Sequence, residues 1–317
     1  MALTELLQDL PGLQIERDAP MSAYTRFGLG GPADWLVDAC DENVFVDALG
    51  RLRSAGIRTE AIGGGSNLVV ADEGFRGVIL RYTNSCLSVD GTVVTAGAGV
   101  VLQDLVDFTV EHGLHGLHTM TGIPGWVGGA VYGNAGAYGR SIDQSISKVR
   151  FFDGDTIRDV GNAECRFRYR DSAFKDNKGW IVFSAELMLI RGDANELRTR
   201  ANEIRGIRDA KYPPTMKCAG SIFKNLILQE LPETVQTVVD PKVVREGKVP
   251  SAWFLDKAGA RGTRNGDIHV ADYHANLIYN AGSGTAQQVR EVVDDLKARV
   301  RSIFNFDIEE EVQYVGF

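Results

Sequence analysis

What this 317-residue sequence lacks excludes several classes of protein. No stretch approaches the roughly 18 consecutive apolar residues of a membrane-spanning helix. Basic residues are outnumbered, with 34 Lys and Arg against 42 Asp and Glu, for a formal net charge of −8. Because non-specific binding to DNA or RNA relies on Lys and Arg facing phosphates, we expect neither a nucleic acid nor a membrane as partner. Residues 1–11 also lack the basic start and apolar run of a signal peptide.

Cysteine is scarce, and its positions form no motif. Cys40, Cys86, Cys165 and Cys218 lie far apart, without a C-x-x-C pair. This spacing favours reduced thiols in a cytoplasmic protein over a disulfide framework.

Several familiar catalytic motifs are missing as well. The sequence contains no G-x-x-x-x-G-K-[ST] loop and no G-x-S-x-G elbow, which disfavours a P-loop nucleotidase and an α/β-hydrolase. His112, His115 and His118 have the spacing of metal ligands on one helix face. Gly113 and Gly116 interrupt that helix, however, and no Cys or acidic residue completes a ligand set. We therefore expect no metal site.

Glycine, in contrast, is abundant. The chain has 36 glycines, about 11% against a usual 7% or so. Residues Gly28–Ala33 match the G-x-G-x-x-A dinucleotide fingerprint, which requires a following helix and an acidic residue about 20 positions later. Pro32 and the extended pattern of Asp34–Ala39 oppose a helix, and residues 50–55 contain no acid. We therefore expect no Rossmann site here.

Two other glycine clusters, Gly63–Asn67 and Gly122–Gly139, offer a different kind of site. Successive backbone N–H groups in glycine-rich turns form concave anion sites that no side chain obstructs. The two clusters could hold the two ends of one pyrophosphate cofactor. From composition alone, tight turns in a strand-rich domain explain them equally well.

The chain length suggests about two domains, and the pattern changes after Arg191, which places a boundary near residue 195. The first part is rich in strands and turns, and the second contains longer helices. The clearest local signals are a helix capped by Asp41 and ending near Ala55, hairpins around Asp90-Gly91 and Asp153-Gly154, and a long helix capped by Thr285.

Three polar segments stand out in and near the second half: 169–172, 220–225 and 309–311. Each alone is best explained as a solvated segment. Together they supply an arginine that can bind a carboxylate, a hydroxyl proton donor and an acid. That is the set of groups needed to stabilise and protonate a carbanion beside a carboxylate.

With these residues in view, the sequence resembles the UDP-N-acetylenolpyruvoylglucosamine reductase family, in its shorter subclass. The resemblance runs in order from about Tyr24 to Gly316, nearly the whole chain. The motifs that carry it are Gly63-Gly64-Gly65-Ser66-Asn67-Leu68, Gly122-Ile123-Pro124-Gly125-Trp126-Val127-Gly128-Gly129, Asn134-Ala135-Gly136-Ala137-Tyr138-Gly139, Tyr169-Arg170-Asp171-Ser172, Gly220-Ser221-Ile222-Phe223-Lys224-Asn225 and Glu311-Val312.

The resemblance implies an α+β fold with a two-lobed FAD-binding domain of the vanillyl-alcohol-oxidase (PCMH) type at residues 1–194. A C-terminal α/β substrate-binding domain would occupy residues 195–317. FAD is expected to be non-covalent, since Ser66 stands where some relatives of the fold tether flavin through His. The implied FAD-binding residues are Gly63, Gly64, Gly65, Ser66, Asn67, Leu68, Gly122, Ile123, Pro124, Gly125, Gly128, Gly129, Asn134, Gly136, Ala137 and Tyr138.

The implied activity is reduction of UDP-N-acetylglucosamine enolpyruvate to UDP-N-acetylmuramate, in peptidoglycan precursor synthesis, with NADPH as hydride donor. By resemblance, Arg170 pairs with the substrate carboxylate, Ser221 protonates C2, and Glu311 assists charge stabilisation. Ser221 is a weak acid that needs support from its neighbours. Substrate contacts are implied, in addition, for Tyr169, Lys211, Asn225 and His274.

The sequence departs from the family pattern at three places. Leu226 stands where proline is usual, Val235–Gly247 is expected to be an extra loop, and the insertion carrying a lid tyrosine in the longer subclass is absent. Two other readings remain: an FAD oxidase of the same fold acting on a small alcohol or sugar, and a non-enzymatic flavin or nucleotide-sugar binder. Neither would use Arg170, Ser221 and Glu311. For assembly, we expect a monomer or a weak homo-oligomer.

Overall fold

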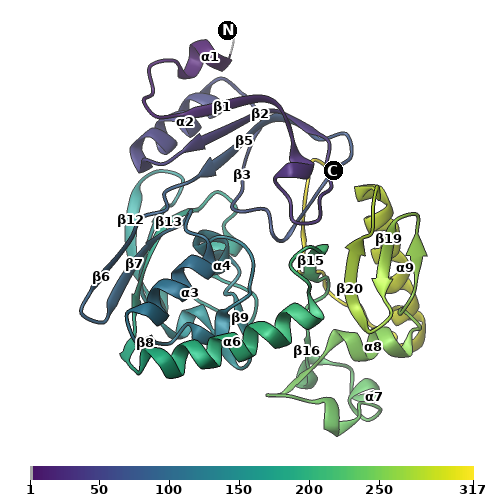
Figure 1. Ribbon diagram of the computed structural model, residues 1–317. Coiled ribbons are helices and arrows are strands. Elements are labelled where there is room, and N and C mark those ends of the chain that lie inside the picture. The colour runs from purple at the N-terminus through teal and green to yellow at the C-terminus, as the bar shows by residue number, and fades with distance from the viewer. Residues whose placement is uncertain (1–2) are drawn as a thin grey trace. The chain divides into compact units, whose positions relative to one another are not determined.

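The structure, a computed structural model, describes residues 3–317, and the chain divides into two units that alternate along the sequence (Figure 1). The first unit contains residues up to Ala19, Ala33–Gly65 and Arg76–Pro214, and the second contains Pro20–Pro32, Ser66–Phe75 and Thr215–Phe317. Two early segments therefore fold with the C-terminal part. The expected limit between residues 194 and 195 concerns the functional domains and stays a prediction.

One sheet of the first unit has the strand order β1-β2-β5-β3 and is accompanied by helix α2. Asp41 caps α2 as predicted, because its carboxylate accepts hydrogen bonds from the N–H groups of Asn43 (2.9 Å) and Val44 (3.0 Å). The elements are α1 (Leu3–Leu7), β1 (Gln14–Pro20), β2 (Pro32–Ala39), α2 (Glu42–Ser54), β3 (Thr59–Ala61) and β5 (Phe75–Tyr82).

The second sheet of this unit has the order β12-β11-β13-β7-β6, and α4 packs against β13 and β7. Both predicted hairpins are confirmed, as β6–β7 and β11–β12. The elements of this part of the first unit, in the sheet and around it, are β6 (Leu87–Asp90), β7 (Val93–Gly97), α3 (Leu102–Glu111), β8 (Leu114–His115), α4 (Val127–Tyr132), β9 (Gly136–Ala137), β10 (Arg140–Ser141), β11 (Ile146–Phe152), β12 (Ile157–Gly161), α5 (Ala173–Asp176), β13 (Ile181–Met188), β14 (Ile190–Arg191) and α6 (Ala194–Lys211).

Aromatic residues join the two sheets of the first unit into one core. Phe45 of α2 packs edge-on against Tyr82 of β5 and Phe183 of β13, with ring centroids 5.9 and 5.6 Å apart. Phe45 and Phe183 are fully buried, and each buried ring contributes roughly 2–3 kcal/mol to stability. The two lobes are therefore held together by apolar packing.

The second unit is built on the sheet β15-β20-β19-β18, with helices α8 and α9 (Figure 1). Thr285 caps α9 in a capping box with Gln288, as the sequence predicts. The elements are β4 (Leu68–Val70), β15 (Lys217–Ser221), β16 (Leu226–Ile227), α7 (Glu233–Gln236), β17 (Lys248–Val249), α8 (Ser251–Lys257), β18 (Arg264–Asn265), β19 (Ile268–Ala271), β20 (His274–Asn280), α9 (Ala286–Phe304) and β21 (Gln313–Val315).

The segment Val235–Gly247, expected to be a loop, is more regular than that. It contains the end of α7 and a 3₁₀ turn at Pro241–Val243. Val235 and Val239 are buried in the core of the second unit. That the segment is an addition to the family pattern stays a prediction, and the two valines fix the segment to the unit.

The dinucleotide fingerprint at Gly28–Ala33 is not followed by a helix, as predicted, because β2 begins at Pro32. Glycine serves close backbone packing here instead, both at Gly31 of the fingerprint and at Gly74, which faces Pro32. A Cβ at Gly31 would lie 2.1 Å from the Asp72 carbonyl oxygen, and one at Gly74 would lie 1.9 Å from the Pro32 carbonyl oxygen. Glycine is needed at both positions because another segment of backbone occupies the space.

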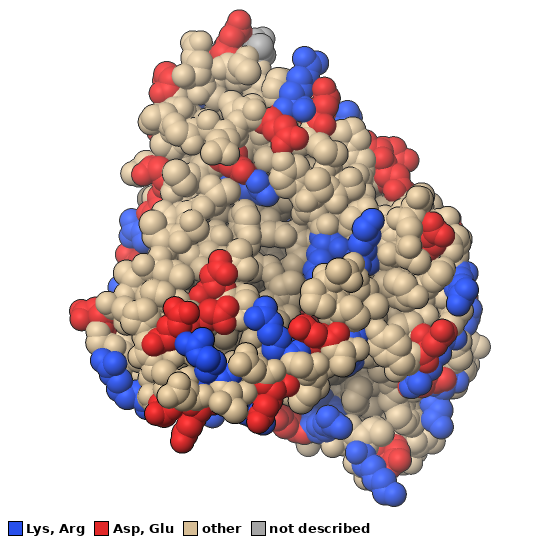
Figure 2. Space-filling model, in the orientation of Figure 1, with Lys and Arg blue, Asp and Glu red and all other residues tan. Residues whose placement is uncertain are grey.

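The predicted helix break in the histidine series is confirmed, since α3 ends at Glu111 and Gly113 has a φ of +63°. His118 is buried, and burial, followed by the charge of His115, lowers its pKa. Within residues 3–317, no three His, Cys, Asp or Glu side chains are grouped to hold a metal ion. The same range contains no helix long and apolar enough to span a membrane. Acidic and basic side chains are interspersed over the face drawn in Figure 2.

Candidate active site

The start of the first glycine cluster, at Gly63 and Gly64, meets the second cluster inside the first unit. A Cβ at Gly64 would lie 2.8 Å from Cδ1 of Trp126, so the first cluster lies directly against the second. The Arg81 guanidinium lies on the same indole ring, 5.4 Å from its centroid. Segments about sixty residues apart in sequence thus form one surface.

Part of that surface is bare backbone. A Cβ at Gly63 would have the Gly129 nitrogen, 3.9 Å away, as its nearest neighbour, and a Cβ at Gly129 would meet no described atom within 4 Å. Gly129 lies in the first turn of α4, where N–H groups face the helix N-terminus. Open glycine backbone at a helix start suits the approach of a pyrophosphate, so these residues fit FAD.

The second cluster is held in place by hydrogen bonds on both sides. The side-chain oxygen of Gln103 in α3 accepts a bond from the Gly122 N–H, at 2.7 Å. The N–H groups of Val127 and Gly128 donate to the carbonyls of Val100 and Ala98, each at 2.9 Å. These bonds fix the shape of the loop, which lowers the entropy cost of binding a ligand.

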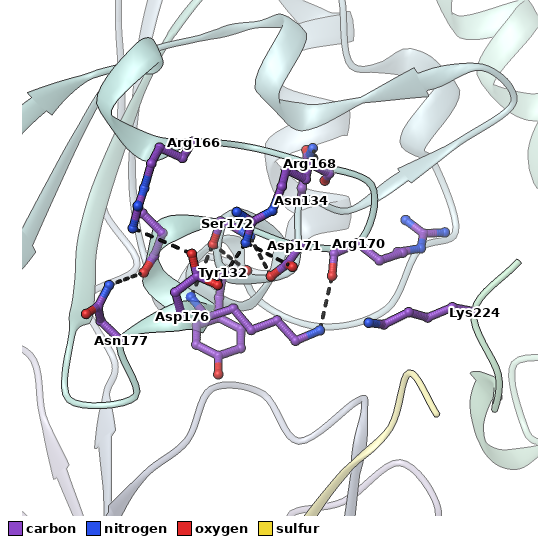
Figure 3. A network of polar contacts seen from close by, with 12 residues as sticks. Tyr132, Asn134, Arg166, Arg168, Arg170, Asp171, Ser172, Asp176, Asn177 and Lys224 are labelled. Carbon is purple, nitrogen blue, oxygen red and sulfur yellow. Dashed lines mark hydrogen bonds and ion pairs between the residues drawn. The ribbon is translucent and has the colours of Figure 1, made fainter. Parts of the chain in front are cut away.

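Arg170 lies in a loop that is tied to the end of this cluster (Figure 3). Its Nη2 donates to the carbonyl of Gly136 at 3.0 Å, and Lys175 Nζ donates to the Arg170 carbonyl at 3.1 Å. Arg170 has a φ of +55°, a left-handed conformation that is strained for a non-glycine residue. The structure therefore brings the predicted catalytic arginine to the predicted cofactor loop.

Two buried side chains anchor the same loop to α4. Ser172, fully buried, donates from Oγ to the Tyr132 carbonyl at 2.7 Å, and Asn134 donates from Nδ2 to the Arg168 carbonyl at 3.0 Å. Burial raises the pKa of Tyr132, and the negative charges of Glu60 and Asp171 add to the effect. The phenol of Tyr132 thus stays protonated and neutral beside the loop.

Ser221 and Glu311 lie on adjacent backbone segments of the second unit. The Glu311 N–H donates to the carbonyl of Ile222 at 2.7 Å, directly after Ser221. Asn67, predicted to bind FAD, donates from Nδ2 to the Glu311 carbonyl at 2.8 Å. Hydrogen bonds to the Glu311 backbone therefore connect the predicted acid both to Asn67, a predicted cofactor residue, and to Ile222, which follows the predicted proton donor.

The remaining predicted FAD-binding residues follow the same division. Ser66 and Leu68 belong to the second unit with Asn67, and Gly65 ends the preceding part of the first unit. The others lie in the 122–138 stretch of the first unit: Ile123, Pro124, Gly125, Ala137 and Tyr138.

The predicted substrate residues are divided between the units. Tyr169 and Lys211 belong to the first, together with Arg170, and Asn225 and His274 belong to the second, together with Ser221 and Glu311. Lys211 is the last residue of α6, and its Nζ lies 5.1 Å from the ring centroid of Tyr212. Asn225 Oδ1 accepts a bond from the Ser251 N–H at 3.3 Å. His274 Nδ1 accepts a bond from the Asn276 N–H at 3.1 Å.

Two family models match different parts of this chain. A family model described as the C-terminal domain of UDP-N-acetylenolpyruvoylglucosamine reductase matches residues 212–315, and one described as an FAD binding domain matches residues 34–157. UDP-N-acetylenolpyruvoylglucosamine reductase of Solibacter usitatus is 54% identical over 310 residues, covering 98% of this chain and 99% of that protein. The chain belongs to this reductase family.

Two further relatives of the reductase family agree. The Bacillus licheniformis protein of the same name is 32% identical and covers 99% of both chains. The crystal structure of the Thermus caldophilus reductase superposes with a TM-score of 0.75 at 28% identity, covering 96% of this chain and 99% of that one. Membership confirms the predicted α+β fold with an FAD-binding domain, FAD as cofactor and the assignment to the oxidoreductases.

Some residues that contact the predicted site residues have no role that the motifs indicate. Trp126 stands within a motif, and its ring lies against Gly64. Asn276 and Ser251 are buried polar residues that hold the segment after Ser221. Asn276 stands between apolar Ala275 and Leu277 in β20, and a polar residue in an apolar strand is the signal that would have identified it.

Proposed function

We propose that this chain catalyses the NADPH-dependent reduction of UDP-N-acetylglucosamine enolpyruvate to UDP-N-acetylmuramate, a step of peptidoglycan precursor synthesis. The observation that carries the proposal is 54% identity over nearly the full chain to a reductase of that name. The three residues expected to do the chemistry, Arg170, Ser221 and Glu311, are all present. FAD-binding and substrate-binding roles are assigned to residues 1–194 and 195–317.

FAD is proposed to bind non-covalently across the open backbone at Gly63 and Gly129. When bound, it supplies a hydride acceptor for NADPH and a hydride donor for C3 of the enol ether. The chain's part is to leave the glycine backbone at Gly63 and Gly129 open to the pyrophosphate and to hold the loop through Gln103 and Asn134. Ser66, Asn67, Leu68 and the remaining predicted residues of the 122–138 stretch complete the proposed site.

Arg170 is proposed to bind the carboxylate of the enolpyruvyl group. Hydride addition at C3 builds negative charge at C2 that spreads into this carboxylate, and a planar guanidinium stabilises that charge by paired hydrogen bonds. The bond from Arg170 Nη2 to Gly136 and the strained backbone at residue 170 fix the position of the arginine. This preorganisation supports a role in binding developing charge.

Ser221 is proposed to donate the proton to C2, and Glu311 to support the charge that forms there. Their segments are joined by the bond from the Glu311 N–H to the Ile222 carbonyl. Tyr169, Lys211, Asn225 and His274 are assigned to substrate binding, with Lys211 on the diphosphate and Asn225 on the nucleotide.

The proposed partners are limited to the two small substrates, without nucleic acid or membrane. Because NADPH and a nucleotide sugar are its substrates, we place the protein in the cytoplasm, as a monomer or a weak homo-oligomer. Analytical ultracentrifugation across a range of concentrations tests the assembly. A tight higher oligomer would refute that part.

The decisive experiment follows the flavin spectrum of the purified protein without oxygen. NADPH should bleach the flavin, and UDP-N-acetylglucosamine enolpyruvate should restore its colour. Acid precipitation should release FAD into the supernatant, as non-covalent binding requires. A colourless protein, or reduced flavin that only oxygen re-oxidises, would reject the reductase in favour of the binder or the oxidase.

Substitutions at two proposed catalytic residues test the mechanism. Ser221→Ala should leave reduction by NADPH intact and slow re-oxidation by the nucleotide about 100-fold or more, the usual contribution of a positioned acid. Equal loss in both half-reactions would remove Ser221 from the proposed role. Arg170→Lys should also slow re-oxidation strongly, because a point charge does not replace a planar fork. Near-normal turnover of that variant would exclude Arg170 from the site.

A further inference from the structure

Asn276, in the middle of β20, is a buried polar residue whose side chain forms three hydrogen bonds. It is 2% exposed. Its Oδ1 accepts a bond from the Phe223 N–H at 2.9 Å, and its Nδ2 donates to the Phe223 carbonyl at 2.8 Å. The amide thus pairs with both backbone groups of one residue, as a neighbouring strand would.

The reason for this pairing is an irregularity in the strand pairing just before this segment. The β15–β20 ladder is irregular between Cys218 and Ser221, and Gly220 has a φ of +79°. Beyond Ser221 the Ile222 N–H donates to the Asn276 carbonyl at 3.2 Å. The Asn276 side chain then continues the ladder past the irregularity, so one residue holds both positions that follow Ser221.

Two further contacts fix the Asn276 amide. Its Nδ2 also donates to Ser251 Oγ at 2.7 Å, and that fully buried hydroxyl donates to the Phe223 carbonyl at 3.2 Å. The Asn276 N–H donates to Nδ1 of His274, a proposed substrate residue. The amide can therefore neither flip nor rotate without leaving buried polar groups unsatisfied, which is costly.

We propose that Asn276 is a positioning residue for proton transfer, which sets the place of Ser221 through the backbone of residues 222 and 223 and orients His274. This inference rests on the proposed function, because it assigns Ser221 the proton transfer to C2. The Ser221 Oγ–H bond breaks and a C2–H bond forms. Serine then recovers its proton from solvent. Asn276 itself touches no substrate atom in this role.

The test compares Asn276→Ala with Asn280→Ala in the FAD-loaded enzyme. Asn280 is a matched control: it lies on the same strand, is 5% exposed, and its Oδ1 accepts bonds from Gly282 and Gly284 at 3.0 Å each. Each variant is followed for flavin reduction by NADPH, re-oxidation by saturating substrate, substrate dissociation constant and thermal unfolding.

Asn276→Ala should slow re-oxidation about 10- to 100-fold, as small misplacements of a reacting group do, with NADPH reduction within about twofold of wild type. The solvent deuterium isotope effect on re-oxidation should rise, because proton transfer becomes more limiting. Asn280→Ala should lower the unfolding temperature and leave both half-reactions within about twofold.

Three outcomes overturn the proposal: equal loss in both half-reactions of Asn276→Ala, the same selective loss in Asn280→Ala, or an unchanged isotope effect. If Asn276→Ala does not fold, Ser251→Ala keeps the amide and removes one of its partners. Ser251→Ala should show a smaller loss of rate, confined to re-oxidation. If this loss is absent, the proposal is also overturned. A wild-type enzyme that the nucleotide cannot re-oxidise refutes the proposed function itself, before any variant is compared.

Discussion

Two glycine-rich regions of this chain look alike in sequence and differ in what occupies the space beside them. Around Gly31 and Gly74 the space is filled by backbone of the same unit, 2.1 and 1.9 Å from where a Cβ would lie. A Cβ added at Gly129 would meet no described atom within 4 Å, and one added at Gly63 would have the Gly129 nitrogen as its nearest neighbour. The first region uses glycine for folding, and the second is the one we assign to FAD.

The difference teaches that a glycine motif identifies a ligand site only when the missing side chains leave room. Gly28–Ala33 matches every position of a nucleotide fingerprint, yet its glycines allow close packing within the protein. At Gly129 a side chain would be harmless to the protein and harmful to a ligand. This contrast can be tested one Cβ at a time.

The largest effect should come from Gly31→Ala. The new Cβ would overlap the Asp72 carbonyl, and backbone cannot move aside as a flexible side chain can, so we expect a loss of about 3 kcal/mol or more in the free energy of unfolding. Urea unfolding measures it. Labelling of buried Cys218, in the same unit, should accelerate more than labelling of buried Cys165, whose pKa burial raises to about 12.

Gly12→Ala is the control for that loss. Gly12 has a φ of +73° and no described atom within 4 Å of a Cβ, so it carries backbone strain without overlap. It should cost only about 1–2 kcal/mol. If Gly31→Ala cost no more than Gly12→Ala, the close approach at Asp72 would not be what requires glycine.

The next effect is on the cofactor. Gly129→Ala should weaken FAD binding about tenfold or more, because a methyl group would enter the surface that the pyrophosphate approaches. Folding should not suffer, since alanine favours a helix by about 0.5–1 kcal/mol over glycine. Titration of the apoprotein with FAD, followed by fluorescence, gives the dissociation constant. Unchanged affinity would move the pyrophosphate away from Gly129.

The smallest effect should come from Gly50→Ala in α2, where a Cβ also meets no described atom within 4 Å. Stability should rise by about 0.5–1 kcal/mol, for the reason given for Gly129. FAD affinity should stay as it is in the wild type. A comparable loss of affinity in Gly50→Ala would mean that the Gly129→Ala result reports a general change rather than a local one.

Local signals in the sequence predicted local structure well. Asp41 and Thr285 cap the expected helices, and Pro32 correctly argued against a helix after Gly31. Such features depend on neighbours within a few residues, which the sequence displays directly.

Contacts between distant segments could not be predicted in this way. The bonds from Asn67 to Glu311 and from Phe223 to Asn276 join residues 244 and 53 positions apart. Which residues meet at such distances depends on strand register and on the irregularity at Gly220, and no local pattern encodes either. The motif residues of the site were therefore found from the sequence, while the residues that hold them in place were not.

The alternating course of the chain has a consequence for how the protein is made. The chain passes between the units five times, after residues 19, 32, 65, 75 and 214. Strand β4 needs β21, which ends at Val315, as its parallel partner, and Asp72 accepts bonds from the first N–H groups of α9, at Ala286 and Gln287. During synthesis, residues 20–32 and 66–75 are made before residues 215–317, with which they form the second unit. The second unit is therefore completed only after residues 215–317 have been made, and those residues expressed alone would keep the Thr285 cap of α9 but lack strand β4 and the Asp72 carboxylate.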